Sequence, residues 1–201
     1  MVEQYYLDLI YKEQKELPNL FLEYLPKNYL PKRILNFCCG IVNEEPILYN
    51  LYGKNIEMIS FDNSEFMDKM AKNLNRKSFL KLDIKKIKEF ATEKYDLIIG
   101  RNIPINSNYN HPIELDYQDY WPIFLNDINK YLNSSSLLFM TLAREDEFNR
   151  TKEILTNLKY KIQIQEKNKI FIPSDRIGIA GADVKDNYVI LAKLSNGNHS
   201  T

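Results

Sequence analysis

Apolar runs and helix-like segments alternate along most of this chain, and this alternation limits the folds that it can adopt. Runs such as 34–38 and 95–99 are almost wholly apolar, which is typical of strands covered on both faces. Longer segments with helical spacing of apolar residues follow them. Five such units in series predict right-handed crossovers and an α/β, Rossmann-like, doubly wound sheet with helices on both faces. The expected strands are 34–38, 57–61, 79–82, 95–99 and 137–142, and the expected helices are 44–51, 64–74, 84–89, 117–132 and 145–158.

The two ends of the chain depart from this alternation. Residues 2–15 carry apolar side chains at helical spacing, which predicts an amphipathic leading helix, and a second short helix is expected over 18–25. Near the other end, 161–170 and 188–194 are expected to be strands with no helix between them. They predict an antiparallel hairpin at the edge of a seven-stranded, mostly parallel sheet. We expect a single domain over 1–201, with a helical cap (1–30), an α/β core (31–194) and a disordered tail (195–201).

Composition narrows the class of protein and of partner. Lys plus Arg and Asp plus Glu number 27 each, so no overall field attracts a polyanion, and nucleic acid is disfavoured as a partner. The basic segment 81–88 is interpreted as a solvated helix face. The adjacent cysteines Cys38 and Cys39 cannot form an unstrained disulfide, and the two histidines, His111 and His199, are distant, so no metal site is expected. With no signal-type or membrane-length apolar run, we expect a cytoplasmic protein with reduced thiols and no membrane partner.

The residues that end the expected strands are the candidates for a ligand site, because doubly wound sheets bind ligands outside the carboxyl ends of their strands. Asp62 follows the first turn by about twenty residues, where a carboxylate accepts hydrogen bonds from ribose hydroxyls. Asp83 ends the third strand, where a carboxylate can accept from an adenine amino group. Capping of the next helix is the alternative role for both, although Asn63 and Ser64 are also available as caps. The strand ends are Cys38-Cys39-Gly40, Asp62-Asn63, Asp83-Ile84 and Gly100-Arg101-Asn102.

Four segments around these strand ends carry a resemblance to a known family. They are residues 34–40 (ILNFCCG), 59–64 (ISFDNS), 81–84 (KLDI) and 95–102 (YDLIIGRN). In order and approximate spacing they resemble the class I S-adenosylmethionine-dependent methyltransferases, which also end with an antiparallel strand inserted beside the sixth. The family often has a helix before its first strand that folds over the cofactor. The resemblance covers nearly the whole chain and implies an S-adenosylmethionine cofactor.

Carried over residue by residue, the resemblance implies a cofactor site at the strand ends. Asp62, with Asn63 beside it, would hold the ribose, and Asp83 and the backbone of Ile84 would read the adenine edge. Asn36, Cys38, Cys39 and Gly40 would pass under the amino-acid end and sulfonium side of the cofactor, and Arg101 and Asn102 would lie near its methionine portion and transferring methyl group.

The first turn departs from the family's usual pattern, which has an acid on the first strand followed by Gly-x-Gly-x-Gly. Asn36 takes the place of the acid, Cys38 that of the first glycine and Val42 that of the last. A β-branched residue does not easily adopt φ > 0. Because the connection to Asp62 is a few residues longer than the compact family pattern, we expect an extended loop over 41–43 to remove the need for glycine at position 42.

The helix after this turn is expected to begin at Glu44, with Asn43 as its N-cap, and to end at Gly53. Glu44 or Glu45 could supply the carboxylate for the ammonium group of the cofactor. The alternative is that both acids only stabilise the helix N-terminus.

Catalysis by such an enzyme mainly requires that a nucleophile be aligned with an already activated methyl group and that water be excluded. His111, in the long loop after the fourth strand, is the candidate general base. Residues 144–147 and 171–185 could close the far side of the site. The aromatic residues that could line a substrate pocket are Tyr109, Tyr117, Tyr120 and Trp121, of which Trp121 could instead belong to the core.

The sequence leaves three functions open. The first is an S-adenosylmethionine-dependent methyltransferase acting on a small-molecule acceptor, which the balanced charge favours. The second is a protein of the same fold that binds S-adenosylmethionine or S-adenosylhomocysteine without methyl transfer, or has lost cofactor binding; the glycine-poor turn motivates it. The third is a nicotinamide-dependent oxidoreductase, which would require a fuller glycine fingerprint than this turn has.

Overall fold

The structure of the chain is a computed structural model. It describes the backbone of residues 2–39, 42–90, 93–103, 120–170, 172 and 186–194, and their side chains except those of 2–10, 90 and 120. The strands are β1 (Arg33–Phe37), β2 (Glu57–Asp62), β3 (Phe79–Lys81), β4 (Tyr95–Gly100), β5 (Leu132–Leu142), β6 (Tyr160–Lys167) and β7 (Tyr188–Leu194). The helices are α1 (Val2–Tyr24), α2 (Glu44–Tyr52), α3 (Glu65–Asn73), α4 (Ile87–Phe90), α6 (Tyr120–Ile128) and α7 (Glu145–Asn157), with 3-10 turns η1 (Ile84–Lys86) and η2 (Asn129–Tyr131).

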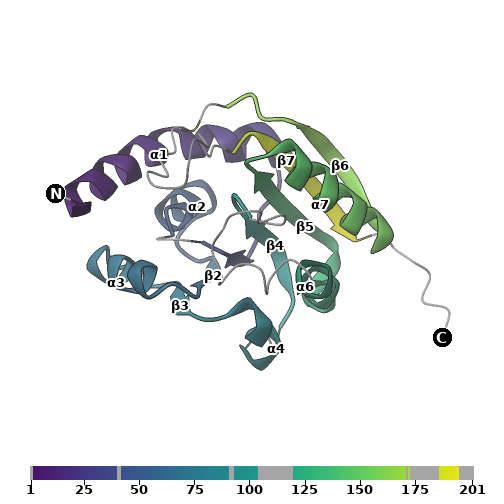
Figure 1. Cartoon of the computed structure of the whole chain (residues 1–201), viewed down its shortest axis with the longest axis horizontal. Helices are drawn as coiled ribbons and strands as arrows, with labels where there is room; N and C mark the ends of the chain where they lie inside the picture. Colours follow the sequence, from purple (N-terminus) through teal and green to yellow (C-terminus); the bar gives the residue numbers. More distant parts are fainter. Residues whose placement is uncertain are drawn as a thin grey trace.

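The seven strands form one sheet in the order β3-β2-β1-β4-β5-β7-β6 (Figure 1). The pairs along β3-β2-β1-β4-β5 are parallel, whereas β7 runs antiparallel to both β5 and β6. The predicted doubly wound sheet with an antiparallel closing hairpin is therefore confirmed. Strand order reverses between β1 and β4, which is where ligands bind in this class of sheet.

Alternate residues of the central strands face two different hydrophobic cores. Ile34 of β1 lies in a core formed with α1 and α2, which includes Leu20 and Leu48. Phe37 of the same strand lies in the opposite core, against α6 and α7. This alternation explains why the central strands read as continuous apolar runs, since both faces of the sheet are covered.

α1 is one continuous helix across Pro18, and the prediction of two separate helices is wrong. A proline inside a helix removes one hydrogen bond and costs about 3 kcal/mol. Leu17, Leu20 and Phe21, on both sides of the proline, are all at most 1% exposed. Full burial of such side chains contributes about 1.5–3 kcal/mol each, so packing on the sheet outweighs the penalty of the proline. None of the described helices is long and apolar enough to span a membrane.

The start of β5 also differs from the prediction, which began this strand only at residue 137. Leu132 already pairs with Tyr95, and the next pair is Leu137 with Leu97, so the intervening residues of β5 bulge out of register. Ser136 stabilises this irregularity, because its hydroxyl donates to the carbonyl of Tyr95 at 2.7 Å and accepts from the backbone N–H of Asn133 at 2.7 Å.

Candidate functional site

The carboxyl ends of β1, β2 and β4 lie side by side. Phe37, the last residue of β1, is in register with Phe61 of β2 and with Gly100 of β4. The residues that follow, among them Cys38 and Arg101, therefore meet at one edge of the sheet, at the point where strand order reverses. This edge is the candidate site.

The turn after β1 holds two residues in the left-handed region of backbone conformation. Cys38 has φ 51° and Val42 has φ 57°. Val42 thus adopts the conformation that its glycine counterpart would adopt, and the expectation that a longer loop would spare it is wrong. Its side chain is fully buried in the core under α1 and α2, and such packing can hold a strained backbone that costs about 1–3 kcal/mol. Gly40 lies outside the described residues.

The two cysteines are not joined in a disulfide, and their side chains contribute to packing. Cys38 is half-buried against the core, and Cys39 is 8% exposed. Burial raises the pKa of the Cys39 thiol well above its ordinary value, and the nearby carboxylates of Asp62 and Glu44 raise it further. Because thiolates are the reactive form, Cys39 is not activated as a nucleophile.

Asp62 stands at the end of β2, next to this turn. Its Oδ1 accepts a hydrogen bond from the backbone N–H of Ser64 at 3.0 Å. Ser64 is the N-cap of α3, since its hydroxyl accepts from the backbone N–H of Met67. The helix is therefore capped by Ser64, as the sequence allowed, and the half-buried carboxylate of Asp62 lies at the edge of the sheet beside exposed Asn63.

Asp83 follows β3 and caps the 3-10 turn η1, because its Oδ1 accepts from the backbone N–H of Lys85 at 2.9 Å. The capping role that the sequence offered as the alternative is thus present in the structure. Ile84 is 6% exposed and packs in the core. A role for the Asp83 carboxylate or the Ile84 backbone toward adenine stays a prediction.

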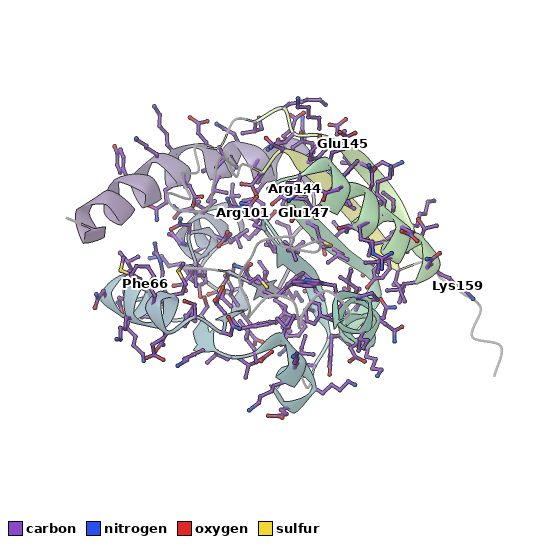
Figure 2. The ribbon with its side chains drawn as sticks, viewed as in Figure 1. Phe66, Arg101, Arg144, Glu145, Glu147 and Lys159 are labelled. Carbon is purple, nitrogen blue, oxygen red and sulfur yellow. The ribbon has the colours of Figure 1, made fainter. Side chains whose placement is uncertain are left out.

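Arg101, the first residue after β4, is 8% exposed and is surrounded by three carboxylates. Its Nη1 lies 2.5 Å from Oε1 of Glu44 on α2. Its Nη2 and Nε reach the two carboxylate oxygens of Asp186 at 2.8 and 3.3 Å, a fork-like arrangement. Nη2 also lies 3.6 Å from Oε1 of Glu13 on α1. Figure 2 shows Arg101 in the interior of the fold, close to the candidate edge.

Amide and hydroxyl side chains extend this cluster across the sheet. Asn36 of β1 donates from Nδ2 to Oε2 of Glu44 at 3.1 Å, and Asn43 donates from Nδ2 to Glu13. On the other side, the hydroxyl of Thr141 on β5 donates to Asp186 and accepts from the backbone N–H of Asn102. The network therefore joins α1, β1, α2, β4, β5 and the segment before β7.

Burial and charge act in opposite directions on this cluster. Burial alone lowers the pKa of Arg101, but the attraction of Asp186, Glu44 and Glu13 outweighs it, so the pKa of Arg101 lies well above its ordinary value. Burial raises the pKa of Glu13, and the opposing attraction of Arg101 does not cancel it. Arg101 is thus a permanent cation in this network, whereas Glu13 holds a proton more readily than an exposed glutamate.

Two sequence predictions near this cluster need correction. Asn43 precedes α2 but makes no side-chain cap, because its backbone is already helical (φ −63°, ψ −23°) and its amide group donates to Glu13 instead. Glu45 turns away from the Arg101 network. It accepts from the backbone N–H groups of Lys77 and Ser78 at 3.2 and 3.0 Å, so it orders the turn before β3. Of the two acids proposed for an ammonium group, only Glu44 lies in the network.

The sequence did not point to Glu13, Thr141 or Asp186. Each lies far from Arg101 along the chain and carries no local motif. The one available signal was that Glu13 interrupts the apolar side of an amphipathic helix expected to fold over the cofactor.

Several residues were predicted to line a substrate pocket or to close the far side of the site. Those that the structure describes have structural roles instead. Trp121 is 2% exposed and packs edge-on to Phe124, so it belongs to the core. Arg144 and Glu147 lie at the start of α7 (Figure 2), where the carboxylate of Glu147 accepts a hydrogen bond from the backbone N–H of Arg144 at 3.3 Å. His111 and most of 171–185 lie outside the described residues, as do Tyr109, Tyr117 and the side chain of Tyr120.

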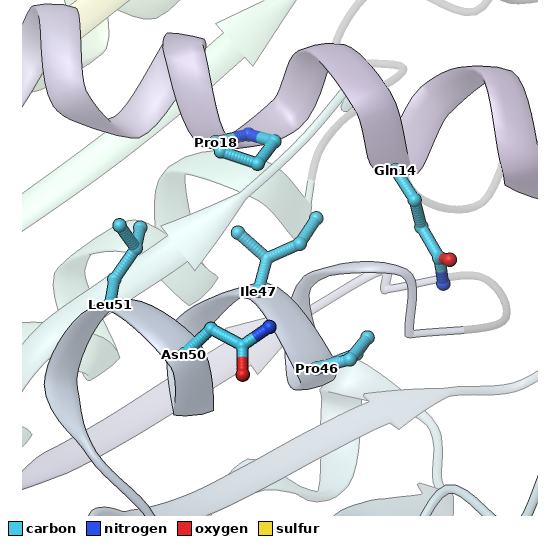
Figure 3. Close-up of a pocket in the computed structure, with 6 residues that line it drawn as sticks. All are labelled: Gln14, Pro18, Pro46, Ile47, Asn50 and Leu51. Atoms are coloured by element: carbon cyan, nitrogen blue, oxygen red, sulfur yellow. The ribbon is translucent and has the colours of Figure 1, made fainter.

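A small pocket of about 220 Å³ opens between α1 and α2 (Figure 3). None of the residues that line it is a predicted cofactor residue, and it is not the crevice at the carboxyl ends of the strands. It shows that the two helices carrying Glu13 and Glu44 are not packed tightly along their whole length. The lining residues are Gln14, Pro18, Pro46, Ile47, Asn50 and Leu51.

Comparison with family models and with curated proteins gives no match, but solved structures are similar in fold. The S-adenosylmethionine-dependent methyltransferase from Clostridium acetobutylicum ATCC 824 gives a TM-score of 0.58 at 12% identity, over 92% of this chain and 91% of that one. The plantazolicin methyltransferase BpumL, solved in complex with SAH (S-adenosylhomocysteine), gives 0.60 at 13% identity, over 92% and 84%. The ribosomal protein L11 methylase from Lactobacillus delbrueckii subsp. bulgaricus gives 0.57 at 14% identity, over 90% and 79%. With its strand order and closing antiparallel hairpin, the chain has the Rossmann-like fold of the class I S-adenosylmethionine-dependent methyltransferases.

Proposed function

We propose that this chain is an S-adenosylmethionine-dependent methyltransferase that acts on a small-molecule acceptor. The observation that carries the proposal is that Asp62 lies beside the turn after β1, in which Cys38 and Val42 are left-handed, at the edge where strand order reverses. A carboxylate at the end of the second strand suits the two hydroxyls of a ribose. At Cys38 and Val42 the backbone has the left-handed conformation that the glycines of a glycine-rich loop would adopt.

The buried acceptors at this edge fit such a ligand. The Oδ1 atoms of Asn36, Asn43 and Asn102 are buried and have no hydrogen-bond donor among the described residues. A buried acceptor left without a donor costs about 1–3 kcal/mol, so donor groups of a ligand would stabilise this edge. S-adenosylmethionine carries such donors in its ammonium, hydroxyl and amino groups.

In this proposal each strand end has one task. Asp62, with Asn63 beside it, holds the ribose, and Asp83 and the backbone of Ile84 face the adenine. Asn36, Cys38, Cys39, Gly40, Arg101 and Asn102 surround the methionine end. The bound cofactor supplies an activated methyl group, and the chain aligns the acceptor and excludes water.

The choice of a small-molecule acceptor rests on charge. The chain has 27 basic and 27 acidic residues, so it lacks the excess of positive charge that binds a polyanion. The similar structures include a methylase of a ribosomal protein and a methyltransferase of plantazolicin, so the fold itself does not select the acceptor. His111 remains the candidate general base.

The alternative function is cofactor binding without methyl transfer, and one observation favours it. Arg101 is already paired with Asp186 and Glu44, so its side chain is less available to the methionine end than the resemblance implies. The two functions differ in turnover. When the chain is incubated with S-adenosylmethionine and a panel of hydroxyl, amine and thiol acceptors, a methyltransferase forms S-adenosylhomocysteine in an acceptor-dependent way.

Binding of S-adenosylhomocysteine, measured by isothermal titration calorimetry, tests the proposed site. We expect Asp62→Ala to weaken binding by at least about tenfold, because charge-assisted hydrogen bonds to the ribose contribute about 1.5–3 kcal/mol. Asp62→Asn removes the charge but keeps an acceptor for the Ser64 N–H. Comparing it with Asp62→Ala separates the effect of the charge on binding from the effect of losing this local hydrogen bond. Glu153→Ala, which removes an exposed carboxylate on α7, is the matched control. Unchanged affinity in both Asp62 variants would disprove the ribose assignment.

A further inference from the structure

The pocket between α1 and α2 has rigid apolar walls (Figure 3). A proline stands on each wall, Pro18 on α1 and Pro46 on α2, and Ile47 and Leu51 of α2 extend the apolar surface. Ile47 is 5% exposed and belongs to the core under α1, so the floor of the pocket is continuous with that core. Because the proline ring fixes its own backbone, these walls are largely preformed, which lowers the cost of binding a ligand between them.

Pro18 also changes the hydrogen bonding of the α1 wall. In a regular α-helix the N–H of residue 18 donates to the carbonyl of residue 14, but proline has no N–H. The carbonyl of half-buried Gln14 therefore lacks the donor that the helix would otherwise supply. Helical carbonyls point toward the residue four positions on, and Gln14 and Pro18 both line the pocket. This acceptor therefore lies along the pocket wall, where a donor from a ligand would stabilise it.

The other polar groups of the pocket determine the charge that its ligand can carry. Gln14 of α1 and Asn50 of α2 place one side-chain amide on each helix (Figure 3), and an amide can both donate and accept. All six lining residues are uncharged, so the lining offers a charged ligand no opposite charge to offset its desolvation. The pocket therefore suits a neutral molecule.

The volume of the pocket limits the size of that molecule. About 220 Å³ equals the liquid volume of roughly seven water molecules and is below the range of about 300–1,000 Å³ that is usual for drug-sized ligands. A ligand of about nine non-hydrogen atoms, such as an aromatic ring with one short polar substituent, is of this size.

We propose that the pocket between α1 and α2 binds a small neutral molecule that has a flat apolar body and an N–H or O–H donor. The apolar body lies between Pro18 and Pro46, and the donor bonds the backbone carbonyl of Gln14. The amide groups of Gln14 and Asn50 bind further polar atoms of the ligand. This site is separate from the carboxyl edge of the sheet, and the proposal does not depend on the proposed function.

A ligand in this pocket would link α1 to α2. Gln14 follows Glu13 along α1, and Pro46 lies two residues after Glu44, and the carboxylates of Glu13 and Glu44 both reach Arg101. The link is therefore next to the network that holds α1 on the sheet. Detachment of α1 would destroy the site, so ligand binding should make this local opening rarer.

Three aromatic probes of nearly the same shape test the proposal. Benzamide has an NH₂ donor, acetophenone has a methyl group in its place, and benzoate is charged and has no donor. Two-dimensional NMR of the full chain measures binding from the shifts of the Ile47 and Leu51 methyl groups. We expect benzamide to bind with a dissociation constant on the order of 1 mM and acetophenone to bind at least about fivefold more weakly. Benzoate should not shift these methyl groups at the same concentrations.

Pro18→Ala tests the role of the Gln14 carbonyl, because it restores the N–H that bonds this carbonyl. The variant removes a helix breaker and should fold. We expect its preference for benzamide over acetophenone to fall below about twofold. Pro46→Ala is the matched control, since it removes the proline of the opposite wall and leaves the Gln14 carbonyl unchanged. It should weaken both probes and keep the ratio of their affinities as in the wild type.

Hydrogen exchange measures the link between the two helices. At ten times its dissociation constant, benzamide should slow about tenfold the amides of α1 that exchange through detachment of this helix. The amides of α7, which does not line the pocket, should be unaffected.

Four results would each overturn the proposal. They are equal affinity of benzamide and acetophenone for the wild type, no methyl shift with benzamide at about twenty times the expected dissociation constant, a preference for benzamide that Pro18→Ala leaves unchanged, and exchange of α1 that benzamide does not slow.

Discussion

Arg101 and Glu44 form a buried ion pair, with Nη1 and Oε1 2.5 Å apart, that joins the end of β4 to the first turn of α2. The same guanidinium reaches Asp186 before β7 and Glu13 on α1. One side chain thus connects parts of the chain that meet only at the carboxyl edge of the sheet. We therefore expect the stability of the fold at this edge to depend on this residue.

Removal of the cation should destabilise the fold strongly. Arg101→Met leaves buried carboxylates without their charge partner, and breaking such a pair costs about 3–5 kcal/mol. Urea unfolding followed by circular dichroism measures the change in the free energy of unfolding. Arg150→Met, which breaks the exposed pair with Glu153, should cost under about 1 kcal/mol. Equal losses in the two variants would mean that the buried pair contributes no more than a surface one.

Gly100, the last residue of β4, should not tolerate a side chain. A Cβ atom there would lie 2.3 Å from Cζ of Phe37 and 2.5 Å from Cδ1 of Ile103. We expect Gly100→Ala to lower the free energy of unfolding by about 1–3 kcal/mol. In a double-mutant cycle, Phe37→Leu should relieve part of this loss, with a coupling of at least about 0.5 kcal/mol. Strict additivity would show that the ring is not the obstacle.

Cys38 should accept glycine at little cost, because it already has a left-handed backbone (φ 51°). Relief of this conformation gains about 1–2 kcal/mol, which offsets the loss of a half-buried side chain. Cys39→Gly is the control, since Cys39 is buried and has no such conformation to relieve; it should lose at least about 1 kcal/mol. Denaturant unfolding compares the two variants, and equal destabilisation would contradict the assignment of Cys38 as a glycine substitute.

The stability of the chain should carry a pH-dependent contribution from Glu13. Burial raises the pKa of Glu13 above its ordinary value of 4.5, so the folded state binds this proton more tightly than the unfolded state. That contribution is fully present below pH 4.5 and is lost as the pH rises through the raised pKa. Arg101, Glu44 and Asp186 face Glu13 and set the size of the effect. Relative to wild type, Glu13→Gln should therefore gain stability as the pH rises through this window.

Urea unfolding at a series of pH values measures this difference. Glu16→Gln is the control, because it shows how much the loss of any carboxylate on α1 changes the dependence of the free energy of unfolding on pH. A difference between wild type and Glu13→Gln that stays constant, or that changes in the opposite direction, would contradict the burial of Glu13 beside Arg101.

The order of the elements could be predicted from sequence because it depends on local signals. The apolar run of β4, and Gly53 at the end of α2 with its N–H bonded to the carbonyl of Tyr49, both match the expectation. Pro18 misled the prediction, because a local helix-breaking signal cannot register the burial of Leu17 and Phe21 on a distant sheet. The backbone conformation of Val42 was predicted wrongly for the same reason, because the packing that stabilises it comes from elements distant in the sequence.

The candidate site was predictable in part. Asp62 and Arg101 are marked by their positions after apolar strands, and both lie at the expected edge of the sheet. The partners of Arg101 were not predictable, since Glu13 and Asp186 come from opposite ends of the chain and only the folded sheet brings them together. Asn43 illustrates the same limit. Its position before α2 suggested an N-cap, but its amide group donates to the carboxylate of Glu13 on α1, which is distant in the sequence.

Thermal unfolding with and without S-adenosylhomocysteine tests most directly whether the carboxyl edge of the sheet is a cofactor site. A ligand at a hundred times its dissociation constant stabilises the folded state by about 2.7 kcal/mol, which for a chain of this size corresponds to a rise in Tm of roughly 5–11 °C. We expect such a rise with S-adenosylhomocysteine and S-adenosylmethionine, none with NAD, and a clearly smaller rise in Asp62→Ala. An unchanged Tm with both sulfur nucleosides at millimolar concentration, or a rise with NAD alone, would contradict an S-adenosylmethionine site in this chain.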